Sequence, residues 1–302
     1  MGAWFSRAFG RAPATAKGAP PPRPPPPAGA EPLGLVAGRG IYPLEVCRLA
    51  RRAGCPHIAV AALVDETDPT IAALADHVDW VHVGQLRRTM QCLNAQGVRR
   101  MMFAGQVRPG RLFGGFRPDF LALRLLWGLK ERNAHSLFGA VADAFAARGF
   151  TVLPAVTYMD ECLAAAGTLG RRRPSRSQQR DIAFGLRIAR EISRLDIGQT
   201  VVVKNGTVLA VEGFEGTDQA IRRGGELGRG GVTVLKVAKP GHDLRFDVPC
   251  IGMATVESLQ AAGARTLAVH AGMTLFLEKE KVLAALDAAG ICVVGVEPQA
   301  AG

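Results

Sequence analysis

The sequence predicts an α/β protein of two α/β domains joined by a linker, with a Rossmann-like first domain and a mixed second domain that contains an antiparallel hairpin. In the first half, apolar runs of strand length alternate with amphipathic helical patterns, as in a parallel sheet covered by helices. In the second half, TVVVKNGTVLAVE (200–212) predicts a hairpin, because Asn205-Gly206 suits the positive φ angles of a type I′ turn. A chain of 302 residues, 48% of them hydrophobic, can bury a core in each domain.

The elements of the first domain follow from this alternation. Gly54, Gly97 and Gly149 stand where three of the helices are expected to end in a left-handed cap. The predicted strands are 33–37, 57–63, 79–83, 99–105 and 150–156, and the predicted helices are 43–53, 70–76, 85–96, 118–132 and 135–148.

Breaks in the pattern set the domain boundaries. Residues 1–32 form a proline-rich tail expected to be disordered, the first domain spans 33–165, the linker 166–176 and the second domain 177–302. The second domain opens on a helix from Ser177, the expected N-cap, to Leu195. Further strands and helices are expected at 232–238, 255–262, 265–269, 274–278, 279–289 and 291–296.

The formal charge of +11 does not indicate a nucleic-acid partner. Residues 1–32 hold four Lys/Arg against one Glu, and residues 171–180 hold five Arg, so much of the excess lies in the tail and the linker region. Aromatic residues make up only 6% of the chain, which leaves little material for base stacking.

The six cysteines are scattered singly, without the spacing of a zinc site, and are interpreted as reduced thiols of a cytoplasmic protein. No apolar run approaches the ~18 residues that span a bilayer. The N-terminal MGAWFSRAFGR has the composition of a short interfacial helix and fits the myristoylation pattern at Gly2, although a disordered tail is the favoured interpretation.

Two glycine-containing loops of the first domain are candidate ligand sites. GLVAGRGIYP (34–43) joins the first strand to the first helix, where Gly38, Arg39 and Gly40 allow a phosphate to approach backbone N–H groups. It is not a dinucleotide fingerprint, because Pro43 stands at the third glycine. In AGQVRPG (104–110), Gln106 leaves the fourth strand at its carboxyl end and is a candidate contact to a uracil or a phosphate. A purely structural turn is the alternative for both loops.

EGFEGTD (212–218) follows the hairpin. It holds Glu212, Glu215 and Asp218 within seven residues, and carboxylates three apart at a strand-to-helix turn can converge on a hard cation such as Mg²⁺. The alternative is that Thr217 or Asp218 only caps the next helix.

VLKVAKPGHDLRFDVP (234–249) places six charged or ionisable side chains at the exit of a buried strand. Lys236 and Lys239 can neutralise a diphosphate, and Asp247 can bind a metal ion or orient a water molecule. A self-contained salt-bridge network is the alternative. The chain contains no nucleophile signature, so displacement by water with the help of a metal ion is favoured over a covalent mechanism.

Three stretches together resemble the UDP-2,3-diacylglucosamine pyrophosphatase family of lipid A biosynthesis, the two-domain α/β type rather than the metallophosphoesterase type. They are GLVAGRGIYP, SRLDIGQTVVVKNGTVLAVEGFEGTDQAIRR (193–223) and VLKVAKPGHDLRFDVPCIGMAT (234–255). The resemblance covers about residues 33–298. It departs from the family at Ala134-His135, at His242 and in the proline-rich extension.

The resemblance implies hydrolysis of UDP-2,3-diacylglucosamine to UMP and 2,3-diacylglucosamine 1-phosphate with Mg²⁺, or alternatively Mn²⁺ or Co²⁺. It also implies two domains closing on the substrate and peripheral contact with the inner membrane, and it leaves a homo-oligomer open. Asp247 matches the essential aspartate, Glu215 and Asp218 the E-G-T-D element, and Lys236 and Lys239 the K-x-A-K element. Thr217 lies within the same E-G-T-D element and is an expected substrate contact.

Two further interpretations complete the sequence analysis. The apolar segment 112–129 is expected either to line a chamber for acyl chains or to be ordinary helix core. The alternative function is a non-catalytic binder of a nucleotide sugar or a lipid, which would tolerate the loss of the carboxylates.

Overall fold

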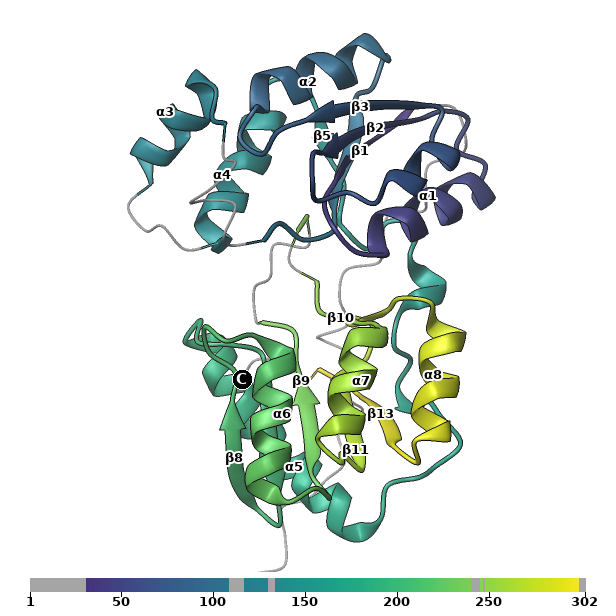
Figure 1. Cartoon of the computed structure of the whole chain (residues 1–302), viewed down its shortest axis with the longest axis vertical. Coiled ribbons are helices and arrows are strands. Elements are labelled where there is room, and N and C mark those ends of the chain that lie inside the picture. The colour runs from purple at the N-terminus through teal and green to yellow at the C-terminus, as the bar shows by residue number, and fades with distance from the viewer. Residues whose placement is uncertain (1–30, 109–116, 130–133, 240–244, 247, 299–302) are drawn as a thin grey trace, which may run out of the picture.

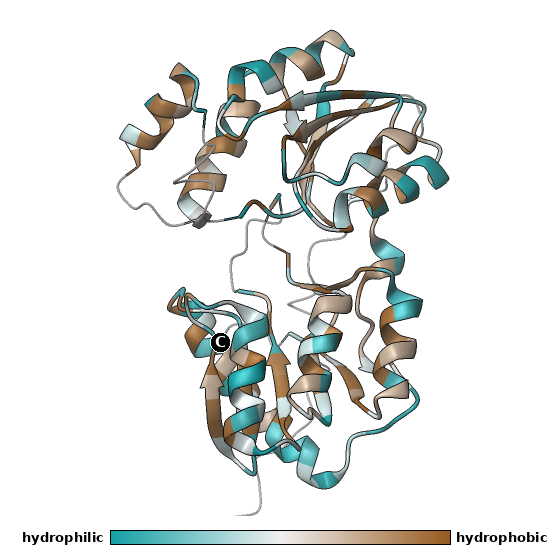
Figure 2. Cartoon of the chain, viewed as in Figure 1, coloured by the Kyte–Doolittle hydropathy of each residue, from teal (hydrophilic) through white to brown (hydrophobic). Residues whose placement is uncertain are grey.

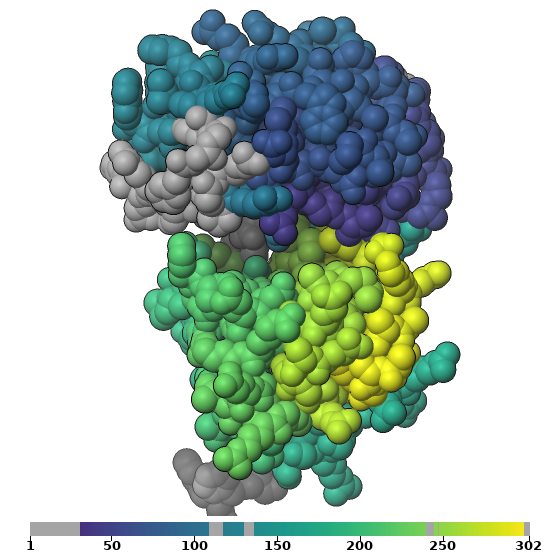
Figure 3. Space-filling view, in the orientation of Figure 1, coloured from purple at the N-terminus to yellow at the C-terminus, as the bar shows by residue number. Residues whose placement is uncertain are grey.

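The computed structural model describes residues 31–108, 117–129, 134–239, 245–246 and 248–298. The chain forms two lobes stacked along the long axis of the molecule, and each lobe contains a sheet with helices packed on it (Figure 1). The lobes meet across a narrower waist (Figure 3). The α/β class with two α/β domains is therefore confirmed.

The first domain contains a five-stranded sheet of order β3-β2-β1-β4-β5 in which every pair is parallel, so the Rossmann-like prediction is confirmed. Side chains alternate between its faces: Leu35 of β1 packs towards α1, and Val36 packs towards α2 and α4. The elements are β1 (Leu33–Ala37), α1 (Tyr42–Arg52), β2 (Ile58–Leu63), η1 (Pro69–Ala73), β3 (His77–Val81), α2 (Leu86–Ala95), β4 (Arg100–Ala104), α3 (Phe120–Gly128), α4 (Ala134–Ala146) and β5 (Thr151–Val152).

Two elements of this domain differ from the predictions. The helix expected at 70–76 is the short 3₁₀ helix η1, which Asp68 caps: its carboxylate accepts from the Thr70 N–H. The strand expected at 150–156 is reduced to β5, because Pro154 has no N–H to continue the ladder. The expected left-handed caps at Gly54, Gly97 and Gly149 are confirmed by positive φ angles.

The second domain contains a six-stranded sheet of order β6-β13-β11-β9-β7-β8. The adjacent strands β13, β11 and β9 are parallel to one another, and β6, β7 and β8 are antiparallel to their neighbours. One face packs against α6, α7 and α8, and the other packs against α5. The 3₁₀ helix η3 (Asp160–Cys162), whose Cys162 is buried in the first-lobe cluster, precedes this domain. The elements of the second domain are β6 (Gly167–Thr168), α5 (Arg176–Arg194), β7 (Thr200–Lys204), β8 (Thr207–Val211), α6 (Thr217–Gly228), β9 (Thr233–Lys236), β10 (Cys250–Ile251), α7 (Met253–Ala261), β11 (Thr266–His270), β12 (Leu275–Phe276), α8 (Lys279–Ala288) and β13 (Cys292–Val296).

The hairpin of β7 and β8 is confirmed, with Asn205 and Gly206 both at positive φ. The buried carboxylate of Asp181 on α5 accepts from both of their N–H groups, at 3.0 and 2.8 Å, which fixes the turn against the helix. The cap of α5 differs from the prediction. Ser175 caps the helix instead of Ser177, because Ser175 is extended and shares a reciprocal capping box with Gln178.

The two lobes share apolar packing. Leu275 and Leu277, which belong to the second half of the chain, are buried in the same cluster as β1, β2 and α1, and Cys250 packs against that cluster. Polar contacts add to this junction, since the carboxylate of Glu45 accepts from the Glu278 N–H at 2.8 Å. Within the described residues, none of the helices is both long and apolar enough to cross a membrane.

Candidate functional site

A chain of polar side chains lies where β9 ends and α6 begins. Lys236, the last residue of β9, is buried, and its Nζ donates to Thr217 Oγ1 at 3.2 Å and to the Cys250 carbonyl at 3.3 Å. The Thr217 hydroxyl in turn donates to Glu212 Oε1 at 2.9 Å. The structure therefore brings Lys236 and Thr217 together, two residues that the sequence analysis selected separately.

Glu212 is the third member of this chain, which the sequence analysis grouped with Glu215 and Asp218 as a possible cation ligand and not with Lys236. It is buried, and its second oxygen accepts from the Gln199 N–H at 3.3 Å. A buried ammonium group is costly without compensation, and a buried carboxylate one hydroxyl away supplies it. The signal was present in the sequence: Glu212 is the first carboxylate of EGFEGTD, at the end of a strand whose interior is apolar.

Asp218 follows Thr217 directly in the sequence and lies in the first turn of α6. Gly216, at φ 84°, is the N-cap of this helix, so the expected capping by Thr217 or Asp218 is not what the structure has. Among the described residues, Asp218 Oδ1 is buried and accepts no hydrogen bond. An orphaned carboxylate oxygen is the kind of ligand that Mg²⁺ prefers, so this residue fits a divalent cation.

Glu215 is engaged elsewhere. One of its oxygens forms an ion pair with Arg223 at 2.6 Å, and the other accepts from the Gly213 N–H at 3.1 Å. The hydrogen bond from Arg223 holds the pKa of Glu215 below its usual value. Within the part of the chain that the structure describes, no three His, Cys, Asp or Glu side chains gather into a metal cluster.

The remaining charges of the 234–249 stretch have separate partners. Lys239 Nζ lies 2.8 Å from Asp196 Oδ1 within the second domain. Arg245 Nη1 lies 2.8 Å from Asp143 Oδ1 of α4, a contact between the two domains. His242, Asp243 and Asp247 fall outside the described residues, so the position predicted for Asp247 stays a prediction.

A second contact between the domains lies beside the first. The ring of Phe246 stacks on the ring of Phe138 of α4, with centroids 5.8 Å apart. The segment that precedes Asp247 is thus held to the first domain by one ion pair and one aromatic stack.

The glycine turn of the first domain is packed against the loop that follows β4. Gly38 N donates to the Ala104 carbonyl at 2.8 Å, and Arg39 and Gln106 exchange two backbone hydrogen bonds, at 2.8 and 3.1 Å. A Cβ atom on Gly38 would lie 2.5 Å from the Gln106 carbonyl oxygen. The N–H groups of Gly38 and Arg39 are therefore used within the protein, and the Gly38 position is required for close backbone approach.

The exposed parts of this turn are the side chains of Arg39 and Gln106 and the backbone of Gly40, at φ 96°. The turn into α1 lies on the side of the first lobe that faces the second lobe, and β9 and the first turn of α6 point back towards it (Figure 1). The end of β9 and the start of α6, which carry Lys236 and Thr217, therefore point towards the first lobe, and ligand sites of open α/β sheets lie at such strand ends.

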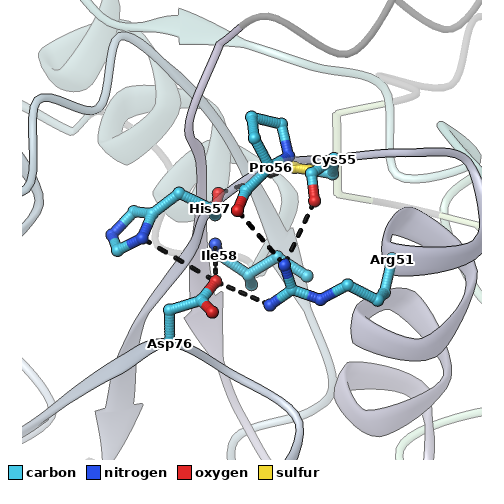
Figure 4. A network of polar contacts seen from close by, with 6 residues as sticks. All are labelled: Arg51, Cys55, Pro56, His57, Ile58 and Asp76. Atoms are coloured by element: carbon cyan, nitrogen blue, oxygen red, sulfur yellow. Dashed lines mark hydrogen bonds and ion pairs between the residues drawn. The ribbon is translucent and has the colours of Figure 1, made fainter.

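Two pockets lie away from the candidate residues, which line neither of them. One, of about 380 Å³, lies beside the hairpin turn at Ser177 and Asn205. The other, of about 670 Å³, lies over α1 and η1, next to a network centred on Asp76 (Figure 4). There Asp76 Oδ2 binds Arg51 at 2.6 Å and accepts from the Ile58 N–H at 2.7 Å, and these bonds tie α1 to β2.

Two protein families divide the chain between them. The LpxI N-terminal domain family matches residues 32–162, and the LpxI C-terminal domain family matches residues 165–294. The UDP-2,3-diacylglucosamine pyrophosphatase LpxI of Caulobacter vibrioides is 38% identical over 285 residues, which are 88% of this chain and 98% of that protein.

Among solved structures, two biotin carboxylase domains align weakly. The domain of the Hydrogenobacter thermophilus 2-oxoglutarate carboxylase has a TM-score of 0.23 and 15% identity over 58% of this chain and 35% of its own. The same domain of a thermophilic 2-oxoglutarate carboxylase has a TM-score of 0.22 and 14% identity over 61% of this chain and 36% of its own. Scores this low carry no inference about either fold or activity.

Proposed function

Because the chain belongs to the LpxI family, we propose that it is a hydrolase that cleaves the pyrophosphate of UDP-2,3-diacylglucosamine with the help of Mg²⁺. The products are UMP and 2,3-diacylglucosamine 1-phosphate, a step of lipid A biosynthesis. The relative from Caulobacter vibrioides is named for action on this substrate. The observation that carries the proposal is the buried Lys236, held beside the first turn of α6 by Thr217 and balanced by Glu212.

In the proposed reaction, water attacks the phosphorus on the sugar side. A bond forms between the water oxygen and that phosphorus, the bond to the bridging oxygen breaks, and UMP leaves with the bridging oxygen. The protons of the water are released as the new phosphate ester ionises. Negative charge grows on the bridging and non-bridging oxygens, so preorganised cations and N–H donors at those positions lower the barrier.

The residues near α6 have complementary roles in this proposal. Lys236 offsets the charge of the diphosphate, and Thr217 keeps the ammonium group in place while it is buried. The first N–H groups of α6 have no partners within a helix and point towards an anion at its N-terminus. Lys239 would contribute after releasing Asp196.

The carboxylates would hold the metal ion. Asp218 supplies an orphaned oxygen, and Asp247 is proposed as its companion ligand or as the group that orients the attacking water. Glu215 stays a prediction as a third ligand, because both of its oxygens already have partners. Mg²⁺ bound there would neutralise the pyrophosphate and polarise its phosphorus centres.

The first domain would receive the uridine and its phosphate. Arg39 and Gln106 are exposed and joined through their backbones. We propose that Arg39 binds the phosphate, that Gln106 binds the uracil, and that Gly40 lets both approach the turn. The substrate is anchored by two acyl chains, so the proposal includes a cytoplasmic protein that acts peripherally at the inner membrane.

An isotope experiment tests both the activity and the site of attack. The purified protein is incubated with the diacylated substrate, Mg²⁺ and ¹⁸O-water, and the products are separated for mass spectrometry. We expect one ¹⁸O atom in the lipid phosphate and none in UMP. Label in UMP would refute attack on the sugar side, and the absence of turnover would refute the enzyme.

A further inference from the structure

Helix α3 exposes large apolar side chains. Leu121 and Ala122 are buried against the domain, whereas Phe120 is 69% exposed and Trp127 is 74% exposed. The two aromatic residues are seven positions apart and so lie on one face of the helix. In Figure 2 most of α3 has apolar colours although it projects from the edge of the first lobe. A helix that is apolar around its circumference is normally buried, so this face is expected to be covered.

The covering partner is indicated by the charges around α3. Arg124 lies on the same face, between Phe120 and Trp127 in sequence, and it is exposed. Arg117 precedes the helix and is also exposed. The acidic residue Asp119 is already engaged, because its carboxylate accepts from the N–H groups of Ala122 and Arg87 at 3.0 and 2.5 Å. The exposed face is therefore apolar and cationic.

This composition favours a lipid surface over a second copy of the chain. In a symmetric dimer through this face, Arg117 and Arg124 of both copies would enter one interface in which the only described acidic residue of the face, Asp119, already has partners. At a membrane interface the same arrangement is favourable, because aromatic rings sit at the level of the headgroups and an arginine extends to the phosphates.

The face is also connected to the candidate site. Helix α3 packs against α4. Phe138 of α4 stacks on Phe246, in the segment that precedes Asp247. Packing contacts therefore connect the exposed helix, through α4, to the second domain.

We propose that α3 is a membrane-docking helix that inserts Phe120 and Trp127 among the headgroups of an anionic membrane, with Arg117 and Arg124 against the lipid phosphates. This inference rests on the proposed function, since a substrate with two acyl chains is held in a bilayer. It also changes the interpretation of the 112–129 segment. Of its described residues, 117–129, one face packs as helix core through Leu121 and Ala122, and the other exposes Phe120 and Trp127; the chamber for acyl chains stays a prediction.

The test is co-sedimentation of the full chain with vesicles in the absence of substrate. The vesicles contain either phosphatidylethanolamine with phosphatidylglycerol or phosphatidylcholine alone. We expect the protein to bind the anionic vesicles, and the Phe120→Ser/Trp127→Ser variant to bind them about tenfold or more weakly, because it loses two inserted rings. Arg124→Glu should weaken binding as well. The matched control is Leu227→Ser, which removes a similarly exposed apolar side chain from α6. This variant should bind the vesicles as the unaltered chain does.

The outcomes separate this proposal from the enzyme proposal. Every variant retains the N-terminal tail, so a difference in binding between the double variant and the unaltered chain can come only from α3. Equal binding by these two proteins would overturn the role of α3. Equal binding to both kinds of vesicle would overturn the role of the arginines. A dimer that becomes a monomer in the double variant, by analytical ultracentrifugation without lipid, would assign the face to a second copy instead. None of these measurements requires turnover.

Discussion

Lys236 Nζ lies 3.2 Å from Thr217 Oγ1, and the same hydroxyl lies 2.9 Å from Glu212 Oε1. A single threonine hydroxyl thus stands between a buried cation and a buried anion. The hydroxyl oxygen accepts a hydrogen bond from the ammonium group, and the hydroxyl proton is donated to the carboxylate. No other direction is possible, because an ammonium group can only donate and a carboxylate can only accept. The ammonium group of Lys236 can therefore bind an anionic substrate, and it keeps Thr217 and Glu212 as partners after the substrate has left.

Replacing Thr217 by valine keeps the shape and removes the hydroxyl. We expect the free energy of unfolding to fall by about 1–3 kcal/mol, because two buried polar groups lose a partner. We also expect kcat/KM to fall while Thr217→Ser retains most of both properties. Urea unfolding and steady-state kinetics check this, and a valine variant as active as the serine variant would contradict the role of the hydroxyl.

Asp218→Asn should separate stability from activity. The Asp218 oxygen is buried and without a hydrogen-bond partner among the described residues, so removing its charge should leave the metal-free protein equally stable or more stable by about 1–3 kcal/mol. Turnover should fall by about a hundredfold or more, as when a preorganised charge is lost from an active site.

Magnesium supplies the control for Asp218. Added Mg²⁺ should raise the melting temperature of the unaltered chain by mass action but not that of the asparagine variant. Equal stabilisation of both proteins by Mg²⁺ would mean that Asp218 is not a ligand.

The contact between Arg245 and Asp143 should hold the segment before Asp247 in place. Asp143→Arg replaces the ion pair by a repulsion, and we expect kcat/KM to fall about two- to fivefold, the range of an exposed pair. The exchange Asp143→Arg/Arg245→Asp should restore most of the loss. If the double exchange is no better than the single variant, the pair does not couple the two domains.

The network around Asp76 should make stability depend on acid. Burial opposes the charge, but hydrogen bonds from the Ile58 N–H and Arg51 hold the pKa of Asp76 below its ordinary value of 3.8. The folded state therefore favours the ionised carboxylate, and this contribution is complete above the ordinary pKa and lost as the pH falls through the lowered one.

Asp76→Asn tests that sign. The variant should be less stable than the unaltered chain at neutral pH, by about 1 kcal/mol. The difference should shrink below pH 4 in urea titrations at stepped pH. A difference that stays constant from neutral to acidic pH would refute the assignment.

The sequence pattern predicts an element correctly where the local preference of its residues and the tertiary packing favour the same conformation. The Asn205-Gly206 turn was predictable because only a few residues tolerate two positive φ angles in succession. The cap of α5 was misplaced by two residues because Ser175 and Ser177 offer the same hydroxyl. Only the reciprocal bond with Gln178 distinguishes them.

The sequence identified Lys236 and Thr217 separately, but not the hydrogen bond that joins them. Glycine at position 38 was interpreted as room for a phosphate, whereas the room is taken by the Gln106 carbonyl, a contact between distant parts of the chain that spacing does not reveal. Lys236 and Lys239 are three residues apart, yet one is buried beside Thr217 and the other binds Asp196. Their partners come from other elements and follow from the topology of the sheet.

The burial of Leu275 and Leu277 among the side chains of β1, β2 and α1 has a consequence for how this chain reaches its native state. The last third of the polypeptide completes a core that the first third begins. Cutting the chain between the two family matches, near residue 163, and separating the fragments would expose an apolar surface on each of them. Ribosomal synthesis must therefore pass Leu277 before the side chains of the earliest-made lobe are fully buried.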